Sequence, residues 1–240
     1  MVIQFGSEQE FERLLAGLAQ EVVDAAIHWR LYSDLTKAIE VFSIEYNQSP
    51  AFWTLTFQSH LDATIFRLIR IYDGNSESLS LRNLLDTIKQ NINLFDTDKF
   101  RQRLKSNPFV NSLASDIRKP DVVQLDKDIS YASTSNHLVK KLTIWRNNLF
   151  AHRKAKMTAR GYNLATDYPI TGEDVGELVK KSVEILNRYS SLFRAETHST
   201  QIVGHDDYKF VLKSIRKNLE QMHKETEALL KKHGKSAKES

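Results

Sequence analysis

Residues 145–154 read Trp145-Arg146-Asn147-Asn148-Leu149-Phe150-Ala151-His152-Arg153-Lys154. This stretch closes an apolar pattern with three- and four-residue spacing that begins at Leu138 and Leu142. Such spacing predicts an amphipathic helix, here from about Ser135 to Ala151. The stretch therefore predicts helical structure and also places an arginine and a histidine at one helix end.

The same helical spacing recurs along almost the whole chain. Only 8 glycines and 4 prolines interrupt it, and alternating strand patterns are nearly absent. Further helices are expected at about 7–46, 51–72, 80–92, 98–105, 122–130, 171–192 and 206–232. We predict an all-α fold: a helical bundle over 1–196, a C-terminal helix over 204–233 that packs on the bundle or on a partner, and a frayed basic tail at 234–240.

Two helix starts carry capping signals. Ser49 followed by Pro50 is typical of an N-cap and a first helical residue. Thr171 followed three residues later by Asp174 indicates a second capped start. Between these starts, four aromatic residues of the helix expected at 51–72 are interpreted as core: Phe52, Trp53, Phe57 and Phe66.

Composition limits the class of protein. A chain of 240 residues that is 41% hydrophobic can bury a full core. It has no run of eighteen apolar residues and no basic, apolar leader, so we expect a cytoplasmic protein without a membrane span. The absence of cysteine excludes a disulfide framework, a thiolate metal site and a cysteine nucleophile.

The net charge of +4 is unevenly distributed. No acidic residue lies between Asp128 and Asp167, whereas seven basic residues do, so the rest of the chain carries −3. A local basic segment is typical of proteins that bind a polyanion such as RNA, although a solvated helix face is equally compatible with it. A second basic cluster, Lys99, Arg101, Arg103 and Lys105, is expected to be a solvated face or an extension of an RNA path.

Arg146 and His152 fit an Arg-x(4–6)-His pattern, for which chance alone gives about one match in a chain of this composition. Arg216 and His223 form such a chance match. The first pair differs in its context: Asn147 follows the arginine, Ala151 precedes the histidine, and the basic, acid-free window of residues 129–166 surrounds both.

Residues Arg146 to His152 resemble the Arg-x(4–6)-His motif of the HEPN superfamily, including the polar residue that this superfamily favours after the arginine. Ile69-Arg70-Ile71-Tyr72-Asp73, followed by Ser80-Leu81-Arg82-Asn83-Leu84-Leu85, looks like the abortive-infection AbiU-type branch. The resemblance covers about residues 10–195 and implies a HEPN-like helical bundle.

Many HEPN proteins are metal-independent ribonucleases that act as toxins or phage-defence effectors, and their sites form between two subunits. The resemblance implies that Arg146 holds the scissile phosphate, that His152 acts in proton transfer or transition-state stabilisation, and that Asn147 orients either. It also implies no cofactor, no metal, an RNA substrate, a homodimer and an antitoxin or defence partner. Lys141, Arg153 and Lys154 are the expected RNA-binding residues. Some HEPN toxins have a tyrosine where this chain has Lys154, so regulation through that tyrosine is in doubt.

The residue types suit this chemistry on their own. A guanidinium presents a fixed fork of donors to phosphate oxygens, and histidine titrates near neutrality. On one α-helix, however, six residues separate Arg146 and His152 by about 240° around the axis and about 9 Å along it. The two side chains then face apart unless the helix unwinds near Ala151, which favours a site completed by a second chain.

Other interpretations remain open at the level of sequence. The same fold is compatible with a non-catalytic RNA- or nucleotide-binding module, or with a structural partner of another protein. His152 is also compatible with a core histidine and Arg146 with a surface arginine. His198, His205, Asp206 and Asp207 match no zinc or two-metal spacing.

Overall fold

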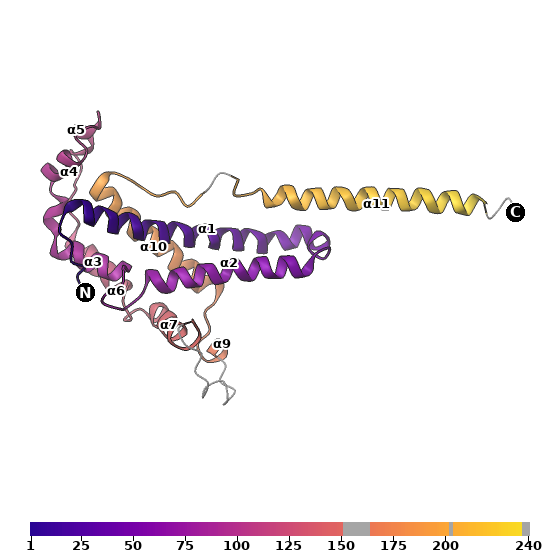
Figure 1. Ribbon diagram of the computed structural model, residues 1–240, viewed down its shortest axis with the longest axis horizontal. Coiled ribbons are helices and arrows are strands. Elements are labelled where there is room, and N and C mark those ends of the chain that lie inside the picture. Colours follow the sequence, from indigo (N-terminus) through magenta and orange to yellow (C-terminus); the bar gives the residue numbers. More distant parts are fainter. Residues whose placement is uncertain (151–163, 202–203, 237–240) are drawn as a thin grey trace. The chain divides into compact units, whose positions relative to one another are not determined.

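The computed structural model describes residues 1–150, 164–201 and 204–236, and the regular elements in these ranges are all helical (Figure 1). The α-helices are α1 (Glu8–Tyr46), α2 (Pro50–Ile71), α3 (Leu81–Gln90), α4 (Thr97–Arg103), α5 (Val110–Leu113), α6 (Val122–Tyr131), α7 (His137–Trp145), α9 (Leu164–Asp167), α10 (Gly172–Arg194) and α11 (Tyr208–Ser236). A 3₁₀ turn, η1, spans Ile92–Phe95, and a π-helical turn, η2, spans Arg146–Phe150. The prediction of an all-α fold is confirmed.

Polar side chains set several helix starts. Thr171 and Asp174 form a capping box on α10, in which each side chain accepts the other's backbone N–H at 3.1 Å. Ser80 caps α3 by accepting from the N–H of Asn83, and Asn136 caps α7 by accepting from the N–H of Leu138. The predicted capped start at Thr171 is confirmed.

The chain divides into two compact units. Unit 1 contains Met1–Trp29 and Leu61–Thr200, and unit 2 contains Arg30–His60 and Gln201–Ser240. In the core of unit 1 three fully buried phenylalanines from α1, η1 and α10 meet edge to face, with ring centroids 5.0–6.2 Å apart: Phe11, Phe95 and Phe193. The end of α2 is fixed to α10 because the buried Tyr72 hydroxyl donates to the carbonyl of Leu178 at 2.9 Å.

The basic cluster at 99–105 was expected to be a solvated face or an extension of an RNA path, and this expectation is wrong for Arg103. Its side chain is only 6% exposed, donates to Glu8 at 2.5 Å and to the carbonyl of Leu94 at 2.8 Å, and lies 3.6 Å from the centroid of the Phe193 ring. These contacts lie inside unit 1, where α4 packs against α10 and η1. Arg103 therefore stabilises the fold.

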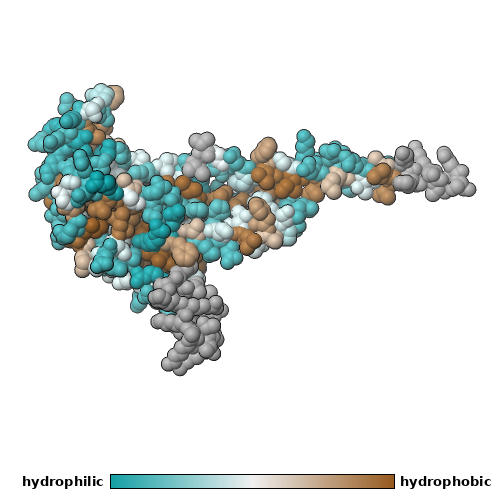
Figure 2. Space-filling model, viewed as in Figure 1, coloured by the Kyte–Doolittle hydropathy of each residue, from teal (hydrophilic) through white to brown (hydrophobic). Residues whose placement is uncertain are grey.

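Unit 2 packs parts of α1 and α2 with the start of α11. Its buried core consists of Leu35, Ala38, Phe42, Tyr46, Trp53 and Leu212. Farther along, α11 is exposed, including Met222, Leu229 and Leu230, and Figure 2 shows apolar side chains near the end of this helix.

The prediction that all four aromatic residues of α2 lie in the core is wrong for two of them. Trp53 is 6% exposed, but Phe52 is 60% and Phe66 47% exposed. Successive helical residues point about 100° apart, so Phe52 faces away when Trp53 faces inward, and Phe66, fourteen residues on, returns to the direction of Phe52. No helix in the described ranges has both the length and the apolar character needed to cross a lipid bilayer.

Candidate active site

The candidate site begins where α7 changes its helical form. Leu138, Val139 and Leu142 bury one face of α7, and Trp145, partly buried at its end, donates from Nε1 to the carbonyl of Tyr168 at 2.7 Å. The predicted helix continues through Phe150, but from Arg146 its hydrogen bonding is that of the wider π-helical turn η2, and Ala151 lies outside the described residues. Such turns are rare and often occur at functional sites.

Asn148 supports this turn. Its side-chain amide donates to the carbonyl of Ile144, one turn earlier, at 2.8 Å. A change from α to π geometry shifts the backbone hydrogen-bond register by one residue, and a side-chain donor near the junction helps to satisfy the carbonyls there. Arg146 is thus the first residue of a locally specified backbone conformation.

The Arg146 guanidinium is held on two sides. Nη1 forms an ion pair with Oδ1 of Asp73, and Nε donates to Oδ1 of Asn147 at 3.1 Å. Among the described residues, Nη2 has no hydrogen-bond partner, and 32% of the side chain is exposed. The arginine is therefore fixed in direction while Nη2 stays available.

Asp73 is itself held by the loop between α2 and α3. Its Oδ1 accepts the N–H of Asn75 at 3.0 Å, and its Oδ2 accepts the hydroxyl of Ser78 at 2.8 Å. The buried amide of Asn83 donates to the carbonyls of both Asn75 and Ser78 at 2.8 Å. This connected hydrogen-bond network fixes the carboxylate that orients Arg146.

Lys141, an expected RNA-binding residue, lies on α7 beside the start of α10. Its Nζ is 3.1 Å from Oδ2 of Asp174, the capping-box carboxylate. Partial burial alone would raise the pKa of the Asp174 carboxyl, but hydrogen bonds from Thr171 and Lys141 outweigh it, so this pKa lies below its ordinary value. Asp174 therefore stays ionised near neutral pH and neutralises Lys141.

The basic window contains no acidic residue of its own, but carboxylates from other segments lie next to it in the fold. Asp73 lies 73 residues before Arg146, and Asp174 lies 33 residues after Lys141, yet each forms an ion pair with a cation of the window. Within the described part of the window, two cations thus have carboxylate partners. The positive charge available to an anion is smaller than the sequence indicates.

The structure brings together Arg146, Asn147 and Asp73, and sets Lys141 against Asp174. The predicted residues His152, Arg153 and Lys154 lie outside the described residues. Sequence reasoning did not assign a role to Asp73, although Asp73 closes the Ile69–Asp73 segment that carries the AbiU-type resemblance. The ion pair between Asp73 and Arg146 joins residues far apart in the sequence, and such a contact produces no repeating pattern by which it could be predicted.

The chance match at Arg216 has different surroundings. Arg216 pairs with Glu45 in unit 2, and His223 lies 3.2 Å from Glu227 one turn along α11. In unit 1, His198 contacts the Ser190 hydroxyl at 3.3 Å. Within the ranges that the structure describes, His, Asp and Glu side chains form no group of three or more that could hold a metal ion.

Comparison with known proteins bears on the same segments. Neither the curated proteins nor the solved structures contain a significant match to this chain. The family model HEPN_AbiU2, described as AbiU2, matches residues 8–233 and therefore includes α2, the Asp73 loop, α7 and α10. Because this match spans nearly the whole chain, the protein belongs to the AbiU2 family of HEPN domains.

Proposed function

We propose that this protein is a metal-independent endoribonuclease of toxin or phage-defence type, active as a homodimer. The observation that carries the proposal is the Arg146 guanidinium, which Asp73 and Asn147 hold while Nη2 has no partner among the described residues. A pre-oriented guanidinium nitrogen can donate to a phosphate oxygen with little reorganisation when the phosphate binds. Membership of a HEPN family associated with abortive infection supports the same activity.

In this proposal Arg146 binds the scissile phosphate and stabilises the charge that develops on its oxygens. Asn147 keeps the guanidinium in place through Nε. The ribose 2′-hydroxyl attacks the adjacent phosphorus, its proton passes to a base, and the 5′-oxygen of the next nucleotide leaves with a proton. His152 is the residue proposed for one of these proton transfers, because its unperturbed pKa lies near neutrality.

Cleavage of RNA in excess EDTA tests the activity. Wild type is expected to cleave, and Arg146→Ala and His152→Ala are each expected to lose about 10²–10³-fold in rate. Arg13→Ala and His223→Ala are matched controls, because both side chains are more than two-thirds exposed and lie outside the candidate site. Absence of cleavage by wild type, or full activity of both site variants, would remove the proposal.

The proposed dimer has its own test. Arg146→Ala and His152→Ala protomers are mixed, partly unfolded and refolded together, so that mixed dimers form. If a site takes its arginine from one chain and its histidine from the other, each mixed dimer regains one intact site and about half of wild-type activity. A site contained in one chain predicts no recovery, since neither protomer then carries both residues.

A second function is favoured by one specific observation. The ion pair between Arg146 and Asp73 already uses part of the guanidinium, as expected if Arg146 only stabilises the fold. The protein would then be a non-catalytic RNA-binding module whose affinity falls steeply as salt rises. RNA binding by wild type without turnover, retained in Arg146→Ala, would favour this function over the ribonuclease.

A further inference from the structure

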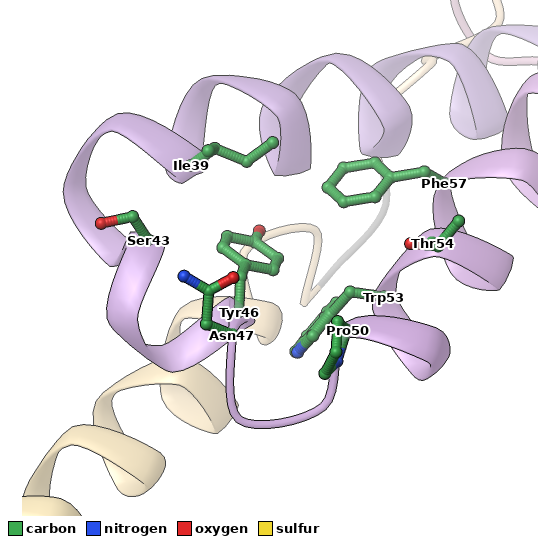
Figure 3. Close-up of a pocket in the computed structure, with 8 residues that line it drawn as sticks. All are labelled: Ile39, Ser43, Tyr46, Asn47, Pro50, Trp53, Thr54 and Phe57. Carbon is green, nitrogen blue, oxygen red and sulfur yellow. The ribbon is translucent and has the colours of Figure 1, made fainter.

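A cavity of about 290 Å³ lies in unit 2, where the end of α1 meets the start of α2 (Figure 3). The two helices form its walls with side chains one turn apart, and α11 contributes none of its lining. None of the residues proposed for RNA cleavage lies in this unit. The cavity is therefore a separate feature of the molecule.

Three aromatic rings line the cavity. The Tyr46 and Trp53 centroids are 4.7 Å apart at an angle of 75°, and the Phe57 centroid is 5.7 Å from that of Tyr46. The Tyr46 hydroxyl donates to the carbonyl of Leu35 at 3.0 Å, and burial, aided by Tyr208, raises the pKa of this hydroxyl to about 12. The hydroxyl is therefore neutral and engaged, which leaves an apolar aromatic surface for a ring to pack against.

Trp53 adds a hydrogen-bond donor that has no partner. The residue is 6% exposed, and its Nε1 is buried without an acceptor. Buried indole N–H groups normally have a partner, because an unpaired donor keeps its full desolvation cost. In Figure 3 the indole nitrogen of Trp53 and the amide oxygen of Asn47 both lie toward the gap between the two helices.

The charge and the size of the cavity limit the class of ligand that it can bind. All lining residues are uncharged, so a phosphate or carboxylate inside the cavity would lack a counter-charge. The volume lies just below the usual range of about 300–1,000 Å³ for ligand pockets, so it suits one small ring system. The Asn47 amide offers a donor and an acceptor side by side, and a half-turn of the amide exchanges them.

We propose that this cavity binds an uncharged planar cyclic amide, the class that includes the uracil base. The ring packs on the aromatic surface, one ring carbonyl accepts from Trp53, and the ring N–H with its other carbonyl pairs with the Asn47 amide. Because Nε1 is covered, the bond to Trp53 requires a small movement of the residues around it. The site goes beyond the proposed cleavage activity and does not depend on it.

Indole ¹⁵N–¹H NMR of the full chain observes the proposed bond directly. The chain has 3 tryptophans, and the indole signal missing from Trp53→Phe identifies Trp53. Uridine is expected to shift that signal with a Kd on the order of 1 mM. 3-Methyluridine, which lacks the ring N–H, is expected to bind at least about tenfold more weakly, as is uridine to Asn47→Ala.

Trp29→Phe is the matched control, because it makes the same substitution in unit 1 and should bind uridine as wild type does. The comparison of uridine with 3-methyluridine uses wild type alone and so holds even if a variant does not fold. No shift of the Trp53 signal at saturating uridine, or equal affinity for both nucleosides, would overturn the proposal.

A short oligouridylate tests whether the base comes from RNA or from a free nucleoside. It is added to the His152→Ala variant, because under the proposed function this variant does not cleave it. Tighter binding than uridine, with the same Trp53 shift, indicates a base presented within RNA, and equal affinity indicates a free nucleoside. An oligouridylate that binds without shifting Trp53 contradicts the site. Because these measurements use a variant lacking His152, failure of the nuclease proposal would leave their outcome unchanged.

Discussion

Arg146 and Arg216 each begin an Arg–His pattern in the sequence and each pair with a carboxylate, but they use their donors differently. Arg216 pairs through Nε with Glu45, donates through Nη2 to the carbonyl of Val41 at 2.7 Å, and lies 4.6 Å from the centroid of the Phe42 ring. Arg146 is held through Nε and Nη1, and among the described residues each arginine keeps one terminal nitrogen without a hydrogen-bond partner, Nη2 in Arg146 and Nη1 in Arg216.

The carboxylates differ as well. The Glu45 side chain is 4% exposed and serves the packing of α11 against α1, whereas Asp73 lies on a loop that a hydrogen-bond network holds in place. Arg216 is bonded along its Nε–Nη2 edge and stacked on one ring face, so it joins α11 to α1. Arg146 is held by a loop carboxylate and the neighbouring amide, and we propose that this orients Nη2 for an incoming anion. The sequence pattern alone does not separate these two cases.

The largest expected effect is on activity. Arg146→Ala should lower the rate of RNA cleavage by about 10²–10³-fold, because a donor to the transition state is lost. Arg216→Ala should leave the rate per folded molecule unchanged, since Arg216 serves only the packing of unit 2. Single-turnover rates, corrected for the folded fraction measured by circular dichroism, check both. Equal losses of cleavage rate in the two variants would contradict the different roles assigned to Arg146 and Arg216.

Asp73→Asn should lower the single-turnover rate by about tenfold, because the amide keeps the shape but removes the charge that orients Arg146. Adding Asp73→Asn to Arg146→Ala should cause no further loss, since the two residues act through one interaction. Rates of the single and double variants form the complete cycle. Additive losses would mean that Asp73 acts independently of Arg146.

Arg216→Ala should lower the melting temperature by a few degrees, because Glu45 then remains buried without its cation. Thermal unfolding followed by circular dichroism measures this change. The matched control is Arg101→Ala, whose side chain is half-exposed and forms only a local ion pair with Asp98. A melting temperature equal to that of the control would contradict the tethering role.

The smallest expected effect is a pH dependence. The hydrogen bond from Arg216 lowers the pKa of Glu45 below its ordinary value of 4.5, and this outweighs the opposing effect of burial. A depressed carboxyl pKa stabilises the folded chain above pH 4.5 and loses that contribution as the pH falls through the folded-state value. Wild type should therefore exceed Glu45→Gln in melting temperature at pH 7, and the difference should shrink below pH 4.5. A constant difference would exclude this titration.

Much of the fold was predictable because helices leave local signals. The three- and four-residue spacing located the long helices, and the Thr171–Asp174 signal marked the start of α10. The exposed Phe52 was not predicted, because hydrophobicity indicates that a residue prefers burial but not which helix face is covered. The π-helical turn at Arg146 was missed because one widened turn barely changes an apolar pattern.

The candidate site was predictable only in part. Arg146 and Asn147 were identified from the motif, but Asp73 and Asp174, which neutralise cations of the basic window, approach from other segments. The burial of Arg103 was missed for the same reason, since Glu8 and Phe193 lie far from it in sequence. Charge counted along the chain does not include partners that folding brings close.

The products formed from one labelled RNA and from DNA of the same sequence, in excess EDTA, test the central claim most directly. The proposed use of the 2′-hydroxyl predicts RNA fragments that end in a 2′,3′-cyclic phosphate and DNA that stays intact. Intact RNA, equal cleavage of the DNA, or cleavage that disappears with EDTA would contradict the assignment of Arg146 and His152 to a metal-independent ribonuclease.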